Sequence, residues 1–240
     1  MKGIILAGGN GTRLLPLTKI TSKQLLPVYD KPMVFYPLDT LLRAGIKDIL
    51  VIVAPDHAGD FLKLLGSGKQ FGAKFTYEMQ DKPEGLAQAF IIGADFIAND
   101  NVTMILGDNI FEDDFSQTIK NFQSGGHVFA KEVPDPERFG VVKFDEHMKA
   151  IQIEEKPKTH LSNYAITGLY IYDNRVVEIA KQVKPSARGE LEITELHNWY
   201  LERSELTVDI VKGEWIDAGT FETLLKASNL MAGKKGSHYL

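Results

Sequence analysis

Apolar and polar residues alternate in blocks along the first half of the chain, and these blocks predict strands alternating with helices. Short continuous apolar runs are typical of strands that are buried on both faces of a parallel sheet. Between the runs, apolar residues recur at helical spacing. The predicted strands are residues 1–7, 48–54, 75–80 and 102–106, and the predicted helices are residues 32–44 and 84–97. This order predicts an α/β fold with a doubly wound sheet and crossover helices.

The second half of the chain has a different pattern, in which strands predominate. Strands are predicted at residues 128–133, 140–144, 150–154 and 165–172, and a further strand at 206–211 follows a helix at 192–203. A last helix is expected to begin near Thr220, a good N-cap, with Glu222 in its first turn. No repeat, low-complexity segment or linker interrupts the sequence. We therefore expect a single domain over residues 1–233, with halves of about 1–125 and 126–233, followed by a frayed tail over 234–240.

Composition and charge narrow the possible partners. The 240 residues carry a formal net charge of −5, which argues against nonspecific binding of nucleic acid. The chain has no cysteine, which excludes disulfides, thiolate zinc sites and cysteine nucleophiles. The first strand begins almost at Met1, leaving no room for a signal peptide, and no apolar run approaches the roughly 20 residues that span a bilayer. We expect a soluble, cytoplasmic protein that binds neither nucleic acid nor membranes.

The end of the first predicted strand is the most informative feature. Residues 1–7 run into a glycine-rich turn, residues 8–11, which is followed by Thr12 and Arg13, and Lys23 lies ten residues further on. Glycines let backbone N–H groups approach phosphate oxygens, and the two cations neutralise charge. A P-loop would need Lys-Ser or Lys-Thr where Thr12-Arg13 stands, and the dinucleotide fingerprint would need a third glycine at Leu14. The turn therefore favours a nucleoside triphosphate, the alternative being a plain turn between strand and helix.

Two aspartates follow short apolar strands and suggest a metal site. Asp108 comes directly after the strand at 102–106, and Asp217 lies between a short strand and the helix that begins near Thr220. Ligands of open α/β sheets gather at the carboxyl ends of the strands. Mg²⁺ prefers one or two carboxylates together with phosphate oxygens, so this pair beside a phosphate loop predicts Mg²⁺ as the cofactor. Either aspartate alone would more commonly be a turn former or a helix cap.

Further polar residues at strand ends and loops are candidates for contacts to a substrate. Glu155 and Lys156 close a strand and suit a sugar hydroxyl and a phosphate, although a solvated charge cluster is the alternative. Arg188 is a candidate phosphate ligand or else a solvated loop residue. Gln80, which offers a donor and an acceptor, and Gly85 suit the edge of a pyrimidine base. The six histidines show no metal spacing, and no Gly-x-Ser-x-Gly motif is present.

These segments together resemble the sugar-1-phosphate nucleotidylyltransferases, most closely those members that use dTTP and glucose 1-phosphate. The resemblance runs in family order over nearly the whole chain. It is carried by residues 6–14, 23–27, 85–89, 106–109, 137–141, 154–157, 188–192 and 215–220. It implies a Rossmann-like single domain with a doubly wound mixed sheet, in which the first half binds the nucleotide and a β-rich lobe binds the sugar.

The resemblance also implies a role for each matching residue. Arg13, Lys23, Asp108 and Asp217 would be the catalytic residues, with Asp108 and Asp217 holding Mg²⁺. The nucleotide would be bound by Leu6, Gly8, Gly9, Gly11, Thr12, Gln80, Pro83 and Gly85. The sugar phosphate would be bound by Asn109, Gly140, Glu155, Lys156, Ile166 and Arg188.

The implied reaction transfers a thymidylyl group from dTTP to glucose 1-phosphate, giving dTDP-glucose and pyrophosphate, the first step toward dTDP-rhamnose and related deoxysugars. A preference for UTP or for another hexose 1-phosphate is the nearer alternative, and a non-catalytic regulatory homologue is the more distant one. Longer members of the family continue past the last helix with a segment that builds a regulatory nucleotide site. Because this chain stops at Leu240, we expect altered or absent feedback control. We also expect a homo-oligomer, a dimer or a tetramer, with the hypothesis that it is smaller than the tetramer of the longer relatives.

Overall fold

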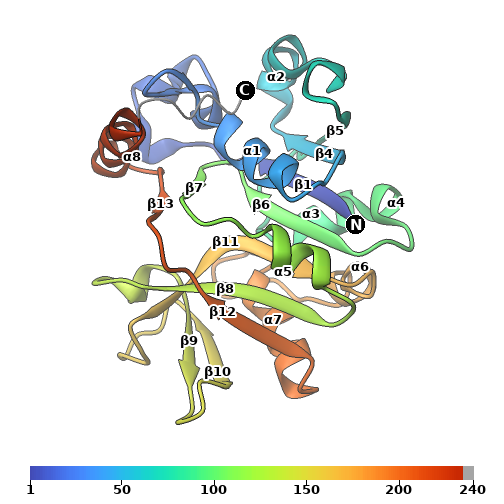
Figure 1. Ribbon diagram of the computed structural model, residues 1–240, viewed down its shortest axis with the longest axis vertical. Coiled ribbons are helices and arrows are strands. Elements are labelled where there is room, and N and C mark those ends of the chain that lie inside the picture. Colours follow the sequence, from blue (N-terminus) through green and yellow to red (C-terminus); the bar gives the residue numbers. More distant parts are fainter. Residues whose placement is uncertain (235–240) are drawn as a thin grey trace.

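A mixed sheet of nine strands forms the centre of the molecule in the computed structural model, which describes residues 1–234 (Figure 1). Its main path runs β10-β9-β11-β6-β1-β4-β5, while β8 pairs with β11 and with β12. The strands are β1 (Lys2–Ala7), β4 (Asp48–Val53), β5 (Lys74–Met79), β6 (Val102–Leu106), β8 (Gly126–Glu132), β9 (Gly140–Phe144), β10 (Ala150–Glu155), β11 (Tyr164–Tyr172) and β12 (Leu206–Ile210). Two small ribbons join β2 (Pro27–Val28) to β3 (Lys31–Pro32) and β7 (Asn109–Phe111) to β13 (Trp215–Asp217).

The first half of the chain supplies the parallel part of the sheet. Strand β1 lies between β4 and β6 and is parallel to both, and β5 is parallel to β4. Strand β11 then pairs antiparallel with β6, β8 and β9. The predicted α/β fold with a doubly wound mixed sheet is therefore confirmed, and all the predicted strands are present with ends that differ by a few residues at most.

Helices cover both faces of this sheet and divide its core in two. On one face, α3 (Gln88–Ile92), α4 (Ala94–Ile97), α6 (Val176–Ala180) and α7 (Ile193–Glu202) pack against side chains such as Ile4 and Tyr172. On the other, α1 (Phe35–Arg43), α2 (Ala58–Leu65) and α5 (Ser116–Asn121) pack against Ile5 and Val51. Ile4 and Ile5 point to opposite faces because side chains alternate along a strand. The last helix, α8 (Phe221–Gly233), packs on the β7–β13 ribbon and on β2 (Figure 1).

Two of the predicted helices differ from the structure. The helix predicted over 84–97 is wrong in its start and its continuity, because it consists of α3 and α4, which meet at Gly93. Gly85 cannot open a helix, since its φ of 113° is not helical. The helix predicted over 32–44 begins only at Phe35, and Pro32 belongs to β3. Helices α2, α5 and α6, of five to eight residues each, were not predicted.

The end of the chain agrees with the prediction as far as it is described. Thr220 is the N-cap of α8, with a capping box to Thr223, and Glu222 lies in the first turn. Helix α8 ends at Gly233, and the expected frayed tail over 234–240 lies outside the described part of the chain except for Lys234. None of the helices within residues 1–234 has the length and the apolar character needed to cross a membrane.

Candidate active site

The glycine-rich turn leaves β1 at the carboxyl edge of the sheet. Gly11 has a left-handed conformation (φ 61°) that a side chain would strain, and it is the N-cap of a short 3₁₀ helix, Thr12–Leu14, which carries Arg13. The Thr18 hydroxyl donates to the Gly11 carbonyl over 2.8 Å and fixes the far side of the turn. The missing side chain of Gly8 has a different purpose: a Cβ there would lie 2.2 Å from Oε1 of Gln80. The Gln80 side chain therefore rests directly on the Gly8 backbone.

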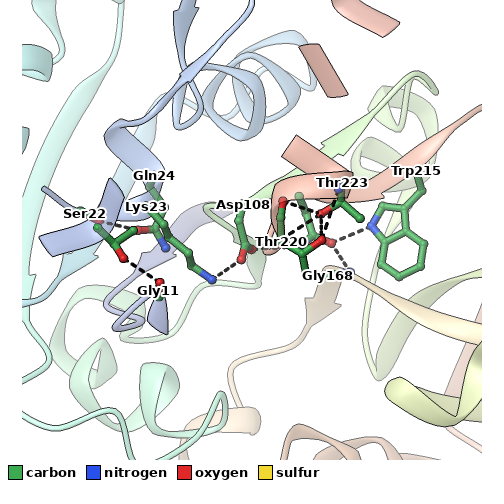
Figure 2. A network of polar contacts seen from close by, with 11 residues as sticks. Gly11, Ser22, Lys23, Gln24, Asp108, Gly168, Trp215, Thr220 and Thr223 are labelled. Carbon is green, nitrogen blue, oxygen red and sulfur yellow. Dashed lines mark hydrogen bonds and ion pairs between the residues drawn. The ribbon is translucent and has the colours of Figure 1, made fainter. Parts of the chain in front are cut away.

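The two predicted metal ligands are brought together by the small ribbon. Strand β13 pairs antiparallel with β7 so that Asp217 lies opposite Asn109, and the Ala218 N–H donates to the Asp108 carbonyl over 2.9 Å. Lys23, on the 3₁₀ helix Lys23–Leu25, forms an ion pair with the Asp108 carboxylate, and Figure 2 shows its side chain reaching across to that residue. Residues from three distant parts of the chain thus meet at one point.

The pKa values of the two aspartates are shifted in opposite directions. Burial is the strongest influence on the pKa of Asp108 and raises it, but the adjacent Lys23 ammonium and a hydrogen bond from Asn109 hold that pKa below its ordinary value overall. Asp217 has no such partner: burial and then the Asp108 charge raise its pKa to about 6, against the opposing effect of Lys23 and Arg13. Its Oδ1 is buried and accepts no hydrogen bond from any described residue. Within residues 1–234, the nearby cations therefore compensate the charge of Asp217 only in part.

Arg13 approaches the same carboxylate through a gap left by a glycine. A Cβ on Gly219 would lie 2.7 Å from Nη2 of Arg13 and 2.9 Å from Oδ1 of Asp217, so a side chain there would clash with both groups. One cavity of about 530 Å³ is lined by all four predicted catalytic residues, which are Arg13, Lys23, Asp108 and Asp217.

Every residue that was predicted to bind the sugar phosphate lines this cavity. These residues are Asn109, Gly140, Glu155, Lys156, Ile166 and Arg188. Asn109 is rigidly held, because its Oδ1 accepts from Trp215 Nε1 (2.7 Å) and from the Gly168 N–H (3.0 Å), and its Nδ2 donates to Asp108 (3.1 Å). The geometry therefore groups these residues next to the four catalytic candidates.

Arg188 already has partners in this structure. Its guanidinium donates to both oxygens of Glu192, over 2.7 and 3.1 Å, and contacts Glu155 at 3.3 Å and Glu190 at 3.4 Å. Burial, followed by repulsion from Glu192, raises the pKa of Glu155, and Arg188 counters this only in part. A phosphate that binds Arg188 would therefore have to compete with these carboxylates.

A second cavity of about 200 Å³ adjoins the first. Of the predicted nucleotide-binding residues, Leu6, Gly9, Gln80, Pro83 and Gly85 line it, whereas Gly8, Gly11 and Thr12 do not. Gln80 is buried, and its Nε2 donates to Gln88 Oε1 over 2.6 Å. Lys23, Asp108, Leu86, Leu106 and Glu190 line both cavities, so they form a shared wall.

Several residues of the larger cavity were not predicted as site residues. They are Leu86, Leu106, Arg138, Phe139, Gly168, Tyr170, Glu190, Glu192, Ile193, Thr194, His197 and Trp215. Strand alternation carries a signal for part of this set, because Gly168 and Tyr170 share a face of β11 with Ile166, and Trp215 shares a face of β13 with Asp217. Helical spacing relates Ile193, Thr194 and His197, but the sequence does not reveal that this face of α7 points to the cavity.

The mixed sheet carries a glycine-rich turn, two cations and two carboxylates at its carboxyl edge, where a small cavity adjoins a large one. This arrangement is that of an enzyme that transfers a nucleotidyl group. The family model described as "Nucleotidyl transferase" matches residues 2–234. The chain belongs to this family.

Similar proteins share almost the whole of this chain. A glucose-1-phosphate thymidylyltransferase from Neisseria meningitidis is 57% identical over 237 residues, which are 96% of this chain and 82% of the relative. One from Mycolicibacterium smegmatis is 56% identical, with the same coverage. The crystal structure of a Bacillus anthracis protein described as a glucose-1-phosphate thymidylyltransferase superimposes with a TM-score of 0.91 at 50% identity, covering 96% of this chain and 94% of that one. A UDP-glucose pyrophosphorylase in complex with UDP-glucose gives 0.84 at 26% identity, covering 98% and 99%.

Proposed function

We propose that this chain transfers the thymidylyl group of dTTP to α-D-glucose 1-phosphate and releases pyrophosphate. The observation that carries the proposal is the pair of adjoining cavities whose shared wall holds Lys23 and Asp108. A nucleotide in the small cavity and a sugar phosphate in the large one would meet at that wall. The activity named for relatives at 57% and 56% identity is the one that needs such a pair of sites.

The chemistry requires positioning and charge neutralisation more than it requires an acid or a base. A phosphate oxygen of the sugar phosphate attacks the α-phosphorus of dTTP in line, and the bond to the pyrophosphate breaks. The attacking oxygen is already anionic, so no proton has to be removed. Arg13 and Lys23 neutralise the charge that develops on the α-phosphate and on the departing pyrophosphate, at a site whose other groups are held in place before the reaction. No covalent intermediate is formed.

Asp108 and Asp217 fit a divalent cation. Asp217 Oδ1 is buried and accepts no hydrogen bond within residues 1–234, and burial together with the Asp108 charge disfavours its ionised form. No cluster of three or more His, Cys, Asp or Glu side chains within residues 1–234 could hold a metal alone. We therefore expect the two aspartates to hold Mg²⁺ together with oxygens of the substrate. When bound, Mg²⁺ neutralises phosphate charge and orients the phosphate oxygens.

Recognition of the two substrates is assigned to opposite sides of the shared wall. Gln80 and Gly85, with Leu6, Gly9 and Pro83, would contact the pyrimidine nucleoside. Gly8, Gly11 and Thr12 would surround the phosphates from the turn itself. Glu155 and Asn109, with Gly140 and Ile166, would bind the sugar, and Lys156 and Arg188 would bind its phosphate.

The second candidate is the same reaction with UTP. The likeness to UDP-glucose pyrophosphorylase, with a TM-score of 0.84, favours it over other nucleotides, because thymine and uracil share the edge that Gln80 would contact. A non-catalytic homologue is disfavoured, since Arg13, Lys23, Asp108 and Asp217 are all present and converge on one cavity.

The experiment is pyrophosphate release with glucose 1-phosphate and Mg²⁺, run in parallel with dTTP, UTP, CTP and GTP. Turnover that is fastest with dTTP supports the proposal. A preference for UTP would transfer the assignment to the second candidate. If glucose 1-phosphate gives no turnover with any of the four nucleotides but another hexose 1-phosphate does, the assigned sugar substrate would change and the proposed mechanism would stand.

Assembly and biological context also belong to the proposal. We propose a homo-oligomer, which light scattering at several protein concentrations would test by its mass relative to 26.8 kDa per chain. A dTDP-glucose product would supply enzymes that make deoxysugars, including dTDP-rhamnose for cell-surface polysaccharide. We also propose that residues 1–125 bind the nucleotide and residues 126–233 the sugar phosphate.

A further inference from the structure

Glu192 lies where α7 begins, but its side chain contacts Arg188 and does not cap the helix. It is the N-cap residue of α7 and is 8% exposed, and its carboxylate makes no capping hydrogen bond. One carboxylate oxygen accepts from Nε of Arg188 over 3.1 Å, and the other accepts from Nη2 over 2.7 Å. Two parallel hydrogen bonds of this kind fix the orientation of a guanidinium as well as its position. Glu192 therefore determines how Arg188 is presented to the larger cavity, which both residues line.

The loop before α7 supports this pair from behind. The Ser186 hydroxyl donates to Glu192 Oε1 over 2.6 Å and accepts from the Arg188 N–H over 3.2 Å. The loop closes on itself, since the Ser186 N–H donates to the Glu190 carbonyl and the Gly189 N–H donates to the Ser186 carbonyl. Gly189 permits the turn with a left-handed φ of 76°. The backbone of Arg188 is therefore tied to the same carboxylate that holds its side chain.

The other two carboxylates near Arg188 hold it less firmly. Glu155 and Glu190 contact only Nη2, at 3.3 and 3.4 Å, whereas Glu192 also binds Nε. Within residues 1–234, Nη1 donates to no other group. The Arg188 side chain is 36% exposed, so a ligand in the cavity has access to part of it. A phosphate that binds this guanidinium therefore competes with the two weaker contacts and can leave Glu192 in place.

We infer that Glu192 is a positioning residue, which orients the Arg188 guanidinium for the phosphate of the sugar substrate and acts only through Arg188. This inference rests on the proposed function, since it assumes that Arg188 binds that phosphate. An arginine side chain has several rotatable bonds, and one that is already ordered binds a ligand at a lower entropic cost. The negative charge of Glu192 has the opposite effect, because it repels an anion. A test therefore has to separate orientation from charge.

Two substitutions at Glu192 make this separation. Glu192→Ala and Glu192→Gln both remove the negative charge, but only glutamine keeps an oxygen that can accept from Arg188. Their difference therefore measures orientation alone. We expect KM for glucose 1-phosphate to be about fivefold higher in Glu192→Ala than in Glu192→Gln, the scale of ordering one long side chain, and KM for dTTP to be the same in both. An equal or lower KM for glucose 1-phosphate in Glu192→Ala would overturn the inference.

Two controls show whether the effect passes through Arg188. Because Glu192 itself lines the cavity, the same pair of variants is compared in an Arg188→Ala background, where their difference should vanish. A difference that persists there would mean that Glu192 contacts the sugar directly, and the inference would fall. Glu195 is exposed in the first turn of α7 and lines neither cavity. Glu195→Ala and Glu195→Gln should give equal KM values; a fivefold difference there would attribute the effect to the start of the helix instead.

A measurement on the unaltered protein does not depend on the folding of any variant. In a crystal structure with glucose 1-phosphate, Arg188 should contact the phosphate and keep both hydrogen bonds to Glu192. A guanidinium that has left Glu192, or that does not contact the phosphate, would overturn the inference. Absence of turnover in the unaltered enzyme, with every nucleotide and sugar phosphate tried, would count against the proposed function instead.

Discussion

Replacing Asp217 with asparagine should make the metal-free protein more stable while it abolishes turnover. The pKa of Asp217 is about 6 in the folded chain, and an aspartate in the unfolded chain has a pKa of about 3.9. The folded state therefore holds a proton between these two pH values that the unfolded state has lost. Stability falls as the pH rises through this window, and the full cost is present above pH 6.

The size of the effect follows from the shift. Two pKa units correspond to about 3 kcal/mol, and because the Asp217 side chain is not fully buried we expect roughly 2 kcal/mol. The Asp217→Asn variant has no charge to bury, so its advantage over the unaltered chain should be near zero at pH 4 and reach that value at pH 8. Urea unfolding in the presence of a chelator, repeated across this pH range, measures the difference directly.

Asp108→Asn is the matched control, because the two aspartates are expected to respond in opposite directions. Removing the Asp108 charge deprives the buried Lys23 ammonium of its ion-pair partner, so this variant should lose about 3 kcal/mol. An Asp217→Asn protein that is less stable than the unaltered chain at pH 8 would refute the reasoning. A difference that does not change between pH 4 and pH 8 would refute it as well.

Three further predictions concern turnover and substrate binding. Arg13→Ala or Lys23→Ala should lower kcat roughly 10²–10³-fold, the scale of losing one preorganised charge partner, and near-normal turnover would remove that residue from the catalytic set. Arg188→Ala should raise KM for the sugar phosphate at least tenfold and leave KM for dTTP unchanged, since a charge-assisted hydrogen bond is lost from one cavity only; equal effects on both substrates would contradict this. Gly8→Ala should displace Gln80, because its Oε1 would lie 2.2 Å from the added Cβ. We therefore expect KM for dTTP to increase more than KM for the sugar phosphate, as steady-state kinetics with each substrate varied in turn would measure.

The sequence was most informative where chemistry and strand ends coincide. Asp108 follows a continuous apolar strand, so its place at the carboxyl edge of the sheet could be predicted from a local pattern. Arg13, Lys23 and Asp108 follow β1 and β6, whose carboxyl ends share an edge because these neighbouring strands are parallel. Apart from Arg188, the predicted sugar residues join them in one cavity from the antiparallel strands β9, β10 and β11 and from the β7 ribbon. Long, strongly periodic segments such as α7 and β11 were also predictable.

The features that could not be predicted from the sequence depend on pairing between segments that are distant in the chain. Asp217 meets Asp108 only because β13 pairs with β7, a three-residue contact across more than a hundred residues of chain. The late start of α3 reflects the close contact of Gly85 with Leu191, where a Cβ would meet the Leu191 backbone at 2.4 Å. The short helix α6 has too few turns to give a clear period.

The shared wall has a consequence for how this family can diversify. Lys23 and Asp108 stand where the two cavities meet, while Gln80 and Pro83 line only one cavity and Glu155 only the other. If the small cavity receives the base and the large one the sugar, as proposed, a substitution that alters the choice of base would leave the sugar side intact, and the reverse would also hold. Selection, or a protein engineer, can exchange either preference separately and combine the results. In this way, enzymes that share one catalytic centre can make many combinations of nucleotide and sugar rather than a single product.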